Sequence, residues 1–157
     1  MTNMRTRRKP IEPTDADKAA SVYVLEDQVG FLLRCAHQKA TETFNAVMAP
    51  FAVTPTQFAA LAKLDDLGSV SQNQLGRLIA MDPATISGVV GRLIARGFVR
   101  QSPHAKDARL VLLALTPAGR VAVRDMKAVA AQVSRRTLEP LTRGEAAALM
   151  QMLARLG

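Results

Sequence analysis

The fold is decided by residues 71–97, which read SQNQLGRLIAMDPATISGVVGRLIARG. Ser71 and Asp82 are residue types that cap helix N-termini, and Pro83 suits the first helical turn after Asp82. Apolar residues recur at spacings of three and four after each cap, and Gly97 is a typical residue at a helix C-terminus. The stretch therefore predicts two short helices joined by a tight turn, which is the helix-turn-helix unit.

The outward face of the second helix differs from that of an ordinary surface helix, which carries Glu and Lys. Ile86, Val89, Val90 and Leu93 would face a core, and the remaining residues are mostly small or hydroxyl-bearing, with no acidic side chain after Asp82. Such a face lets the backbone approach DNA closely and lets hydroxyls bond to bases or phosphates. The alternative is that the small residues serve helix packing. With the first turn of the preceding helix, the predicted DNA contacts here are Gln72, Asn73, Gln74, Pro83, Ala84, Thr85, Ser87, Gly88 and Arg92.

Residues 98–114 predict a two-stranded hairpin. Two apolar-rich runs, 98–101 and 110–114, flank the turn-like segment PHAKD at 103–107. A basic hairpin after a helix-turn-helix is a wing, which can reach the DNA backbone or place Arg in a narrow minor groove. The alternative is a solvated loop with ordinary charges. Beside the preceding helix the wing is the better interpretation, and it adds Lys106 and Arg109 to the predicted contacts.

Helices are predicted on both sides of this central segment. An amphipathic pattern runs from about 17 to 49, and the capping box Thr54-Pro55-Thr56-Gln57 opens a helix that ends at Gly68. After the hairpin, helices are expected over about 117–138 and 142–156. We therefore expect a mainly α winged helix-turn-helix domain over residues 16–157, with about six helices and one hairpin. Residues 1–15 are expected to form a flexible basic arm.

The bulk composition agrees with a nucleic-acid-binding protein of the cytoplasm. The formal net charge of +8 favours a polyanionic partner, although Arg5, Arg7, Arg8 and Lys9 of the arm supply half of it. The single cysteine, Cys35, excludes an intramolecular disulfide and suits a reducing compartment. No apolar run approaches the ~18 residues that span a bilayer, and no apolar segment follows the basic start as in a secretory signal. We expect a cytoplasmic protein without membrane contact.

From about Tyr23 to Gly119 the sequence resembles the MarR family of winged-helix regulators. The matching segments are Leu32-Leu33-Arg34, Thr54-Pro55-Thr56-Gln57-Phe58, Asp82-Pro83-Ala84-Thr85-Ile86-Ser87, Gly97-Phe98-Val99, Asp107-Ala108-Arg109 and Leu115-Thr116-Pro117-Ala118-Gly119. The resemblance implies that Asp107 stabilises the wing and that Arg109 reaches the minor groove. The chain departs from the family pattern at Ala108, where a second Arg is common, and at Gly88, where a larger, often basic residue is frequent.

The resemblance also implies a homodimer that releases DNA when a small aromatic or phenolic effector binds. The apolar residues of the last two helices exceed what one small winged helix needs to bury, and such faces mark interfaces. These residues are Val121, Val123, Met126, Val129, Val133, Leu138, Leu149, Met152, Leu153 and Leu156. A two-fold dimer would read a pseudo-palindromic DNA site. We predict a transcriptional regulator, most simply a dimeric repressor of such an operator.

The first long helix carries the candidate sensing residues. Arg34, His37 and Gln38 lie in its middle and are candidates for contact with an effector carboxylate, the alternative being structural or dimer contacts. Cys35 lies among them, and the family resemblance raises oxidant sensing as an alternative function. We expect instead a buried, small hydrophobic side chain, because Cys35 lies beside the apolar stripe and has no second cysteine to form a disulfide.

Two other function classes are less well supported. A winged-helix module that binds a ligand or a protein without reading DNA is disfavoured by the hydroxyl-rich helix face and by Arg109. An enzyme is disfavoured because the two histidines, His37 and His104, fall on distant elements. The sequence also has no spaced metal ligands and no Gly-rich phosphate loop. We expect no catalytic residue, no metal and no cofactor.

Overall fold

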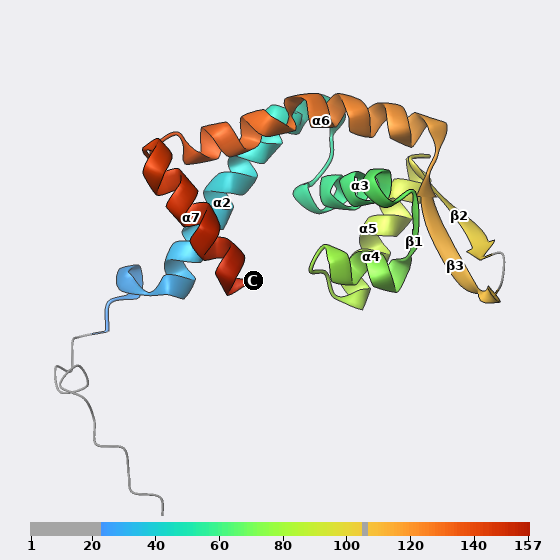
Figure 1. Ribbon diagram of the computed structural model, residues 1–157, viewed down its shortest axis with the longest axis horizontal. Helices are drawn as coiled ribbons and strands as arrows, with labels where there is room; N and C mark the ends of the chain where they lie inside the picture. The colour runs from blue at the N-terminus through green and yellow to red at the C-terminus, as the bar shows by residue number, and fades with distance from the viewer. Residues whose placement is uncertain (1–22, 105–106) are drawn as a thin grey trace, which may run out of the picture. The chain divides into compact units, whose positions relative to one another are not determined.

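The structure is a computed structural model of the 157-residue chain, in which residues 23–104 and 107–157 are described, the side chains of 108 and 109 excepted (Figure 1). The chain divides into two compact units, Met1–Cys35 and Ala36–Gly157. The predicted basic arm at 1–15 lies outside the described residues.

The first long helix begins later than the sequence predicts. Leu25–Asp27 form a short 3-10 helix, η1, and the α-helix α2 runs over Val29–Met48. Val24 and Gln28, on either side of η1, have extended backbone angles, which interrupts the helical path. Val24 is β-branched, and such residues favour the extended region. The earlier part of the predicted helix, before residue 23, lies outside the described residues.

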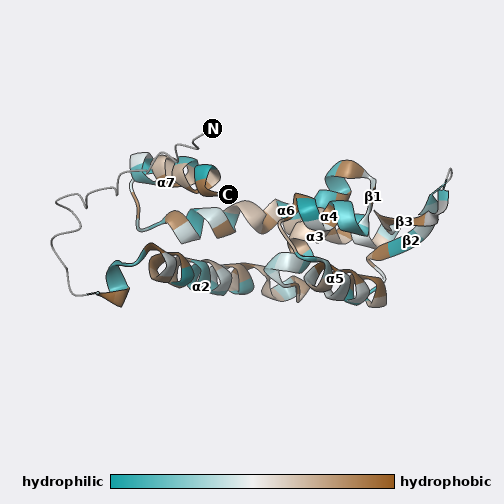
Figure 2. Ribbon diagram, turned by 90° about the horizontal axis from the view of Figure 1, so that it is seen from below, coloured by the Kyte–Doolittle hydropathy of each residue, from teal (hydrophilic) through white to brown (hydrophobic). Residues whose placement is uncertain are grey.

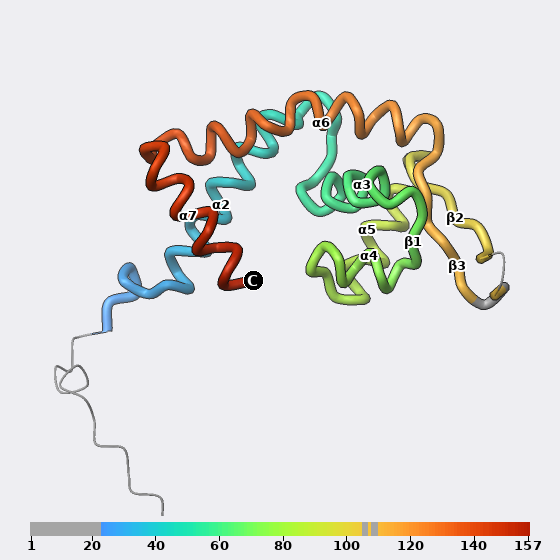
Figure 3. Tube along the Cα trace, viewed as in Figure 1, coloured from blue at the N-terminus to red at the C-terminus, as the bar shows by residue number. Residues whose placement is uncertain are grey.

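Three further helices confirm the predicted helix-turn-helix and the helix before it. They are α3 (Pro55–Leu67), α4 (Gln72–Leu78) and α5 (Pro83–Ala95), whose succession can be followed in the chain trace of Figure 3. The predicted capping box of α3 is complete: the Thr54 hydroxyl accepts from the Gln57 N–H, and the Gln57 side-chain oxygen accepts from the Thr54 N–H. This bond explains why a polar side chain, Gln57, is only 6% exposed.

The predicted hairpin forms, but the sheet has a third strand. β2 (Val99–His104) and β3 (Asp107–Leu115) pair antiparallel, and β1 (Ser69–Ser71) pairs antiparallel with β3, so that the order is β1-β3-β2. β1 was not predicted, because three residues are too few to display the period-two alternation of a strand. Val70 of β1 lies opposite Leu113 and is 3% exposed, so the short strand contributes to the core.

The apolar residues of α3, α4, α5 and the sheet form one core. Leu61, Leu75, Leu93 and Leu113 are each 0% exposed, and the α5 stripe that the sequence predicted as inward-facing is buried with them. Among the described residues, no single helix is long and apolar enough to cross a membrane. In this part of the chain, α4 and α5 reach that length and composition when they are taken together, and the chain bends by 111° between them.

The last two helices are α6 (Pro117–Leu138) and α7 (Arg143–Leu156). Thr116 caps α6 and also docks its first turn, because its hydroxyl donates to Gly97 O at 2.6 Å and accepts from the Gly119 N–H at 3.0 Å. A Cβ on Gly119 would lie 2.0 Å from Phe98 O, so only glycine fits there. The Leu115–Gly119 motif is thereby explained as a close junction between α6 and the start of β2.

α6 and α7 differ in how much they bury. Val123 and Met126 of α6 are 0% and 1% exposed, whereas α7 contains no buried residue. Figure 2 shows hydrophobic residues interleaved with hydrophilic ones along α7. The pattern is that of an amphipathic helix whose apolar side remains open within a single chain.

Candidate DNA-binding surface

The turn between α4 and α5 depends on a close backbone approach. Ala80 has a left-handed φ of 53°, and the Met81 N–H donates to Gly76 O at 2.8 Å. A Cβ on Gly76 would lie 3.1 Å from Met81 O and 3.2 Å from Cγ2 of Ile86, so a larger residue would push the two helices apart. The resulting bend of 111° leaves the first turn of α5 exposed.

Asp82 organises that first turn. One carboxylate oxygen accepts from the Ala84 N–H at 3.0 Å and from the Thr85 N–H at 2.9 Å, while the other accepts from the Thr85 hydroxyl. The hydroxyl bond, followed by the Thr85 N–H, holds the pKa of Asp82 below its usual value, so the cap is charged at neutral pH. Because its proton is used in this bond, the Thr85 hydroxyl offers a partner its lone pairs and its methyl group.

The residues predicted to face DNA on α5 are all exposed. They are Pro83, Ala84, Thr85, Ser87, Gly88 and Arg92. The opposite side of the helix, Ile86, Val89, Val90 and Leu93, is at most 2% exposed. On α4, Asn73 and Gln74 are exposed and Gln72 is half-buried. The Ser71 hydroxyl accepts from the Gln74 N–H at 3.3 Å, which confirms Ser71 as the cap of α4.

The wing is described in its strands but not at its tip. Lys106 lies outside the described residues, and Arg109 belongs to β3, with its side chain not described. Asp107 begins β3, is exposed, and lies opposite His104 in the strand register, after an irregularity between Pro103 and His104. The predicted roles of Lys106, Asp107 and Arg109 therefore stay predictions.

Arg96, which follows α5, is a structural residue that no pattern in the sequence indicates. Its guanidinium donates to Ala52 O and to Phe51 O, both at 2.8 Å, and lies 4.7 Å from the centre of the Phe98 ring. The end of α5 is thereby tied to the segment that connects α2 to α3. Ala52 has a left-handed φ of 49°, and it lies 44 residues away in sequence, so no local pattern indicated this contact.

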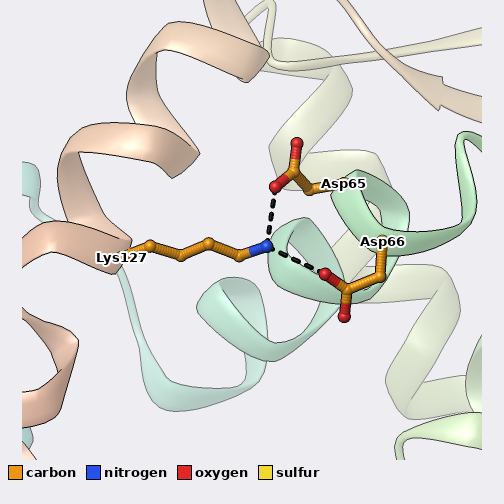
Figure 4. A network of polar contacts seen from close by, with 3 residues as sticks. All are labelled: Asp65, Asp66 and Lys127. Carbon is orange, nitrogen blue, oxygen red and sulfur yellow. Dashed lines mark hydrogen bonds and ion pairs between the residues drawn. The ribbon is translucent and has the colours of Figure 1, made fainter.

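A second tertiary contact joins α6 to α3. The Lys127 amino group lies 2.6 Å from a carboxylate oxygen of Asp65 and 2.9 Å from one of Asp66 (Figure 4). The hydrogen bonds to Asp65 and Asp66 raise the pKa of Lys127, and the hydrogen bond and charge of Lys127 lower that of Asp66. We call these three residues the Lys127 clamp. The sequence gives no sign of it, because Lys127 lies more than 60 residues from the two aspartates.

The candidate sensing residues of α2 are open to solvent. Arg34, His37 and Gln38 are exposed, and the Arg34 guanidinium lies 5.7 Å from the centre of the Phe31 ring. Cys35 is also exposed, so the expectation of a buried side chain was wrong. The reason is that α2 buries only Phe44 and Met48, both near its C-terminal end.

A groove of about 1070 Å³ lies between α2 and α6. Its charged lining residues are Lys39 and Glu42 of α2, Arg135 and Arg136 of α6, and Glu139, which follows α6. Lys39 and Glu42 pair with each other at 3.4 Å, on a strongly exposed part of the helix. The groove thus displays charges of both signs. Among the described residues, no group of His, Cys, Asp and Glu has a metal-binding arrangement.

The chain is similar in sequence and in structure to known transcriptional regulators. Residues 53–111 match the family model described as MarR family. Over 148 residues the chain is 36% identical to the HTH-type transcriptional repressor NicR of Pseudomonas putida, with 94% of each chain covered. A probable transcriptional regulator from Pseudomonas aeruginosa has a TM-score of 0.81 at 45% identity, covering 85% of this chain and 100% of that one.

The chain also resembles the solved structure of BpsR from Bordetella bronchiseptica, a protein whose DNA binding is regulated by 6-hydroxynicotinic acid. It matches with a TM-score of 0.81 at 35% identity and covers 85% of this chain and 96% of that one. The likeness to NicR and to these structures covers the helices on both sides of the winged helix as well as the segment matched by the family model. The chain belongs to the MarR family of winged helix-turn-helix transcriptional regulators.

Proposed function

We propose that the protein is a sequence-specific DNA-binding repressor that binds a pseudo-palindromic operator as a homodimer. The observation that carries the proposal is the exposed face of α5, which has no acidic side chain from Pro83 to Ala95. The acid that precedes it, Asp82, has both carboxylate oxygens occupied by the first turn of its own helix. An α-helix with such a face fits the major groove, where carboxylates close to phosphates would be repelled.

The proposed contacts divide by chemistry. Thr85 and Ser87 would approach base edges together with the small residues of α5, whereas the amides of Gln72, Asn73 and Gln74 suit sugar and phosphate contacts. The wing would add Lys106 at the DNA backbone and Arg109 in the minor groove, with Asp107 stabilising the wing. Base reading is thus assigned to α5, and positioning to α4 and the wing.

The homodimer is proposed from the surfaces that a single chain leaves open. Met150, Met152, Leu153 and Leu156 of α7 are 56%, 52%, 39% and 71% exposed. Exposed apolar faces of this kind mark protein interfaces. The mixed charges of the groove between α2 and α6 also suit a second copy, which would bring the same charges to it. A two-fold arrangement would place two α5 helices about one DNA turn apart.

The effector is proposed from the relatives and from α2. DNA binding by BpsR is regulated by 6-hydroxynicotinic acid, an aromatic carboxylic acid. Arg34, His37 and Gln38 are exposed on α2 and supply donors for such a carboxylate. We therefore place the effector contact at these residues. Because the family consists of transcriptional regulators, we propose no catalytic activity for the protein. We also propose that it acts in the cytoplasm, where DNA is accessible.

The decisive experiment is selection of bound sequences from random DNA, followed by titration of the selected duplex at several salt concentrations. A specific binder should select a pseudo-palindrome, and its affinity should fall steeply as salt rises because phosphate contacts release counterions. Equal affinity for every duplex, or an affinity that salt does not change, would instead indicate a winged-helix module that does not read DNA.

The wing is tested on the selected operator. Arg109→Ala should weaken binding by roughly 1–3 kcal/mol, because one minor-groove contact is lost. Arg124→Ala is a matched control, since this exposed arginine of α6 pairs with its neighbour Asp125 and belongs to no proposed contact. If the Arg109 variant binds the operator with unchanged affinity, Arg109 of the wing does not contact DNA.

The effector is tested on the same complex. Adding 6-hydroxynicotinic acid should release DNA from the parent, and Arg34→Met should require a higher concentration while binding DNA equally well. 6-Hydroxynicotinamide, which lacks the carboxylate, is the matched control ligand. Release of equal strength by the acid and the amide would rule out the proposed carboxylate contact.

A further inference from the structure

The side chain of Arg92 lies over Gly88, one helical turn nearer the start of α5. A Cβ on Gly88 would be 3.5 Å from Nη1 of Arg92, 3.8 Å from Nη2 and 4.0 Å from Cζ. The two terminal nitrogens are nearer than Cζ, so the Nη edge of the guanidinium is turned toward the place where another residue's side chain would begin. Helical side chains lean toward the N-terminus and meet the residue four positions earlier, and a glycine there leaves the space open.

The guanidinium of Arg92 also has no partner among the described residues. Within the described residues it forms no hydrogen bond and no ion pair, and the side chain is exposed. Arg96, four residues later, differs because two backbone carbonyls hold it. Arg92 therefore keeps its N–H donors available for a partner, at a position displaced by about 6 Å along the helix from its own backbone.

Other donors are scarce on this part of α5. Pro83 and Ala84 have no side-chain donor, and the Thr85 hydroxyl donates to Asp82. Ser87 adds a single hydroxyl. The N-terminal turns of a recognition helix are those that approach base edges, and guanine presents two acceptors there, O6 and N7, which an Arg fork satisfies together.

We propose that Gly88 and Arg92 act as one specificity-determining pair, in which the bare backbone at Gly88 lets the Arg92 guanidinium reach a guanine in each half-site. The inference rests on the proposed function, because it requires α5 to enter the major groove. The competing role for Arg92 is a phosphate contact, which would carry no sequence information.

The test is to measure the base preference of variants by selection from random DNA and by titration of all four bases at each operator position. Arg92→Gln should lower the preference for one guanine per half-site by about tenfold or more, with adenine gaining there, since Gln pairs with adenine N6 and N7. The ranking at other positions should stay. Arg77→Gln, an exposed arginine of α4, is the matched control for the lost charge and should leave the base ranking unchanged.

Gly88 is tested by two substitutions. Gly88→Ala should keep the guanine preference, because its Cβ would make ordinary van der Waals contacts with the guanidinium. Gly88→Val should lose the preference as Arg92→Gln does, and the double variant should lose no more. Circular dichroism and thermal unfolding check that each variant is folded.

The outcomes separate this inference from the proposed function. If the parent selects no sequence, the proposed function fails. If the parent selects an operator and Arg92→Gln weakens all duplexes equally, Arg92 contacts phosphate and the inference is overturned. Retained guanine preference in Gly88→Val, or its complete loss of DNA binding, would overturn the pairing of the two residues.

Discussion

The winged-helix part of the chain and its C-terminal helix α7 have similar apolar periodicity but different fates. Between Val53 and Met126 the apolar stripes meet one another, so that Leu61, Leu75 and Val123 are 0% exposed. α7 has an apolar stripe as well, yet none of its 14 residues is buried. Periodicity therefore shows which side of a helix is apolar, whereas the surrounding structure decides whether that side is covered.

The difference has an energetic consequence. Burying a Leu or Val side chain contributes about 1.5–3 kcal/mol, so the winged helix has a stabilising core of its own. Isolated helices of fewer than about 12–15 residues are marginal in water, and α7 has that length. Its helical state is therefore expected to depend on the association that covers its apolar side, in contrast to the winged helix.

The largest effect is expected on the free energy of unfolding, when a glycine in each of the two regions is replaced by alanine. Gly119→Ala should destabilise the fold by about 3 kcal/mol or more, because the new Cβ would overlap Phe98 O and must shift backbone. Gly144→Ala in α7 meets nothing within 4 Å and should leave stability unchanged or raise it by up to about 1 kcal/mol. Urea unfolding of both variants measures the difference. Equal effects would remove the contrast between a packed and an open region.

The next effect concerns the open side of α7. Leu153→Asp should weaken dimerisation by about 2 kcal/mol, which is about 30-fold in the dissociation constant, because a charge would enter an apolar interface. Gln151→Asp, also exposed on α7, is the matched control and should have little effect. Sedimentation equilibrium gives the constants. The parent should also unfold at higher temperature as its concentration rises, and this dependence should weaken in the Leu153 variant. Equal dimerisation of both variants would mean that another surface forms the interface.

The smallest effect concerns the Lys127 clamp, in which α6 is joined to α3. The coupling between Lys127 and Asp65 in a double-mutant cycle of Lys127→Met and Asp65→Asn should be on the order of 0.5 kcal/mol, since both side chains are about one-third exposed and screened. Lys39→Met, whose partner Glu42 lies in the same helix, should have no measurable effect on stability. A coupling energy of zero would mean that the ion pair of Lys127 and Asp65 does not contribute to stability.

The pH dependence of the clamp has a definite sign. The pKa of Asp66 is lowered, so its stabilisation is present above the pKa of an unfolded aspartate and is lost as the pH falls through the lowered value. The pKa of Lys127 is raised, so its stabilisation is present below the pKa of an unfolded lysine and is lost as the pH rises through the raised value. The difference between the parent and Lys127→Met should thus be largest around neutral pH and shrink toward both extremes.

Local signals in the sequence predicted much of the fold and of the candidate surface. The caps at Thr54, Ser71, Asp82 and Thr116 all form the hydrogen bonds that their residue types favour. The start of the first long helix, the strand β1 and the exposure of Cys35 were not predicted correctly. Each depends on backbone or chain neighbours that short-range periodicity does not report.

By itself the sequence determined the order of the helices, the hairpin, the apolar side of each element and the absence of acidic side chains on the face of α5, because caps, turn residues and periodicity act within a few residues. The tertiary structure alone decided which apolar sides are covered, that Arg96 holds the end of α5, that Lys127 joins α6 to α3, and that the guanidinium of Arg92 lies over Gly88. The Arg96 and Lys127 contacts join residues more than 40 positions apart, and the position of Arg92 depends on a side-chain conformation. Neither the long-range contacts nor the side-chain conformation of Arg92 forms until the chain has packed.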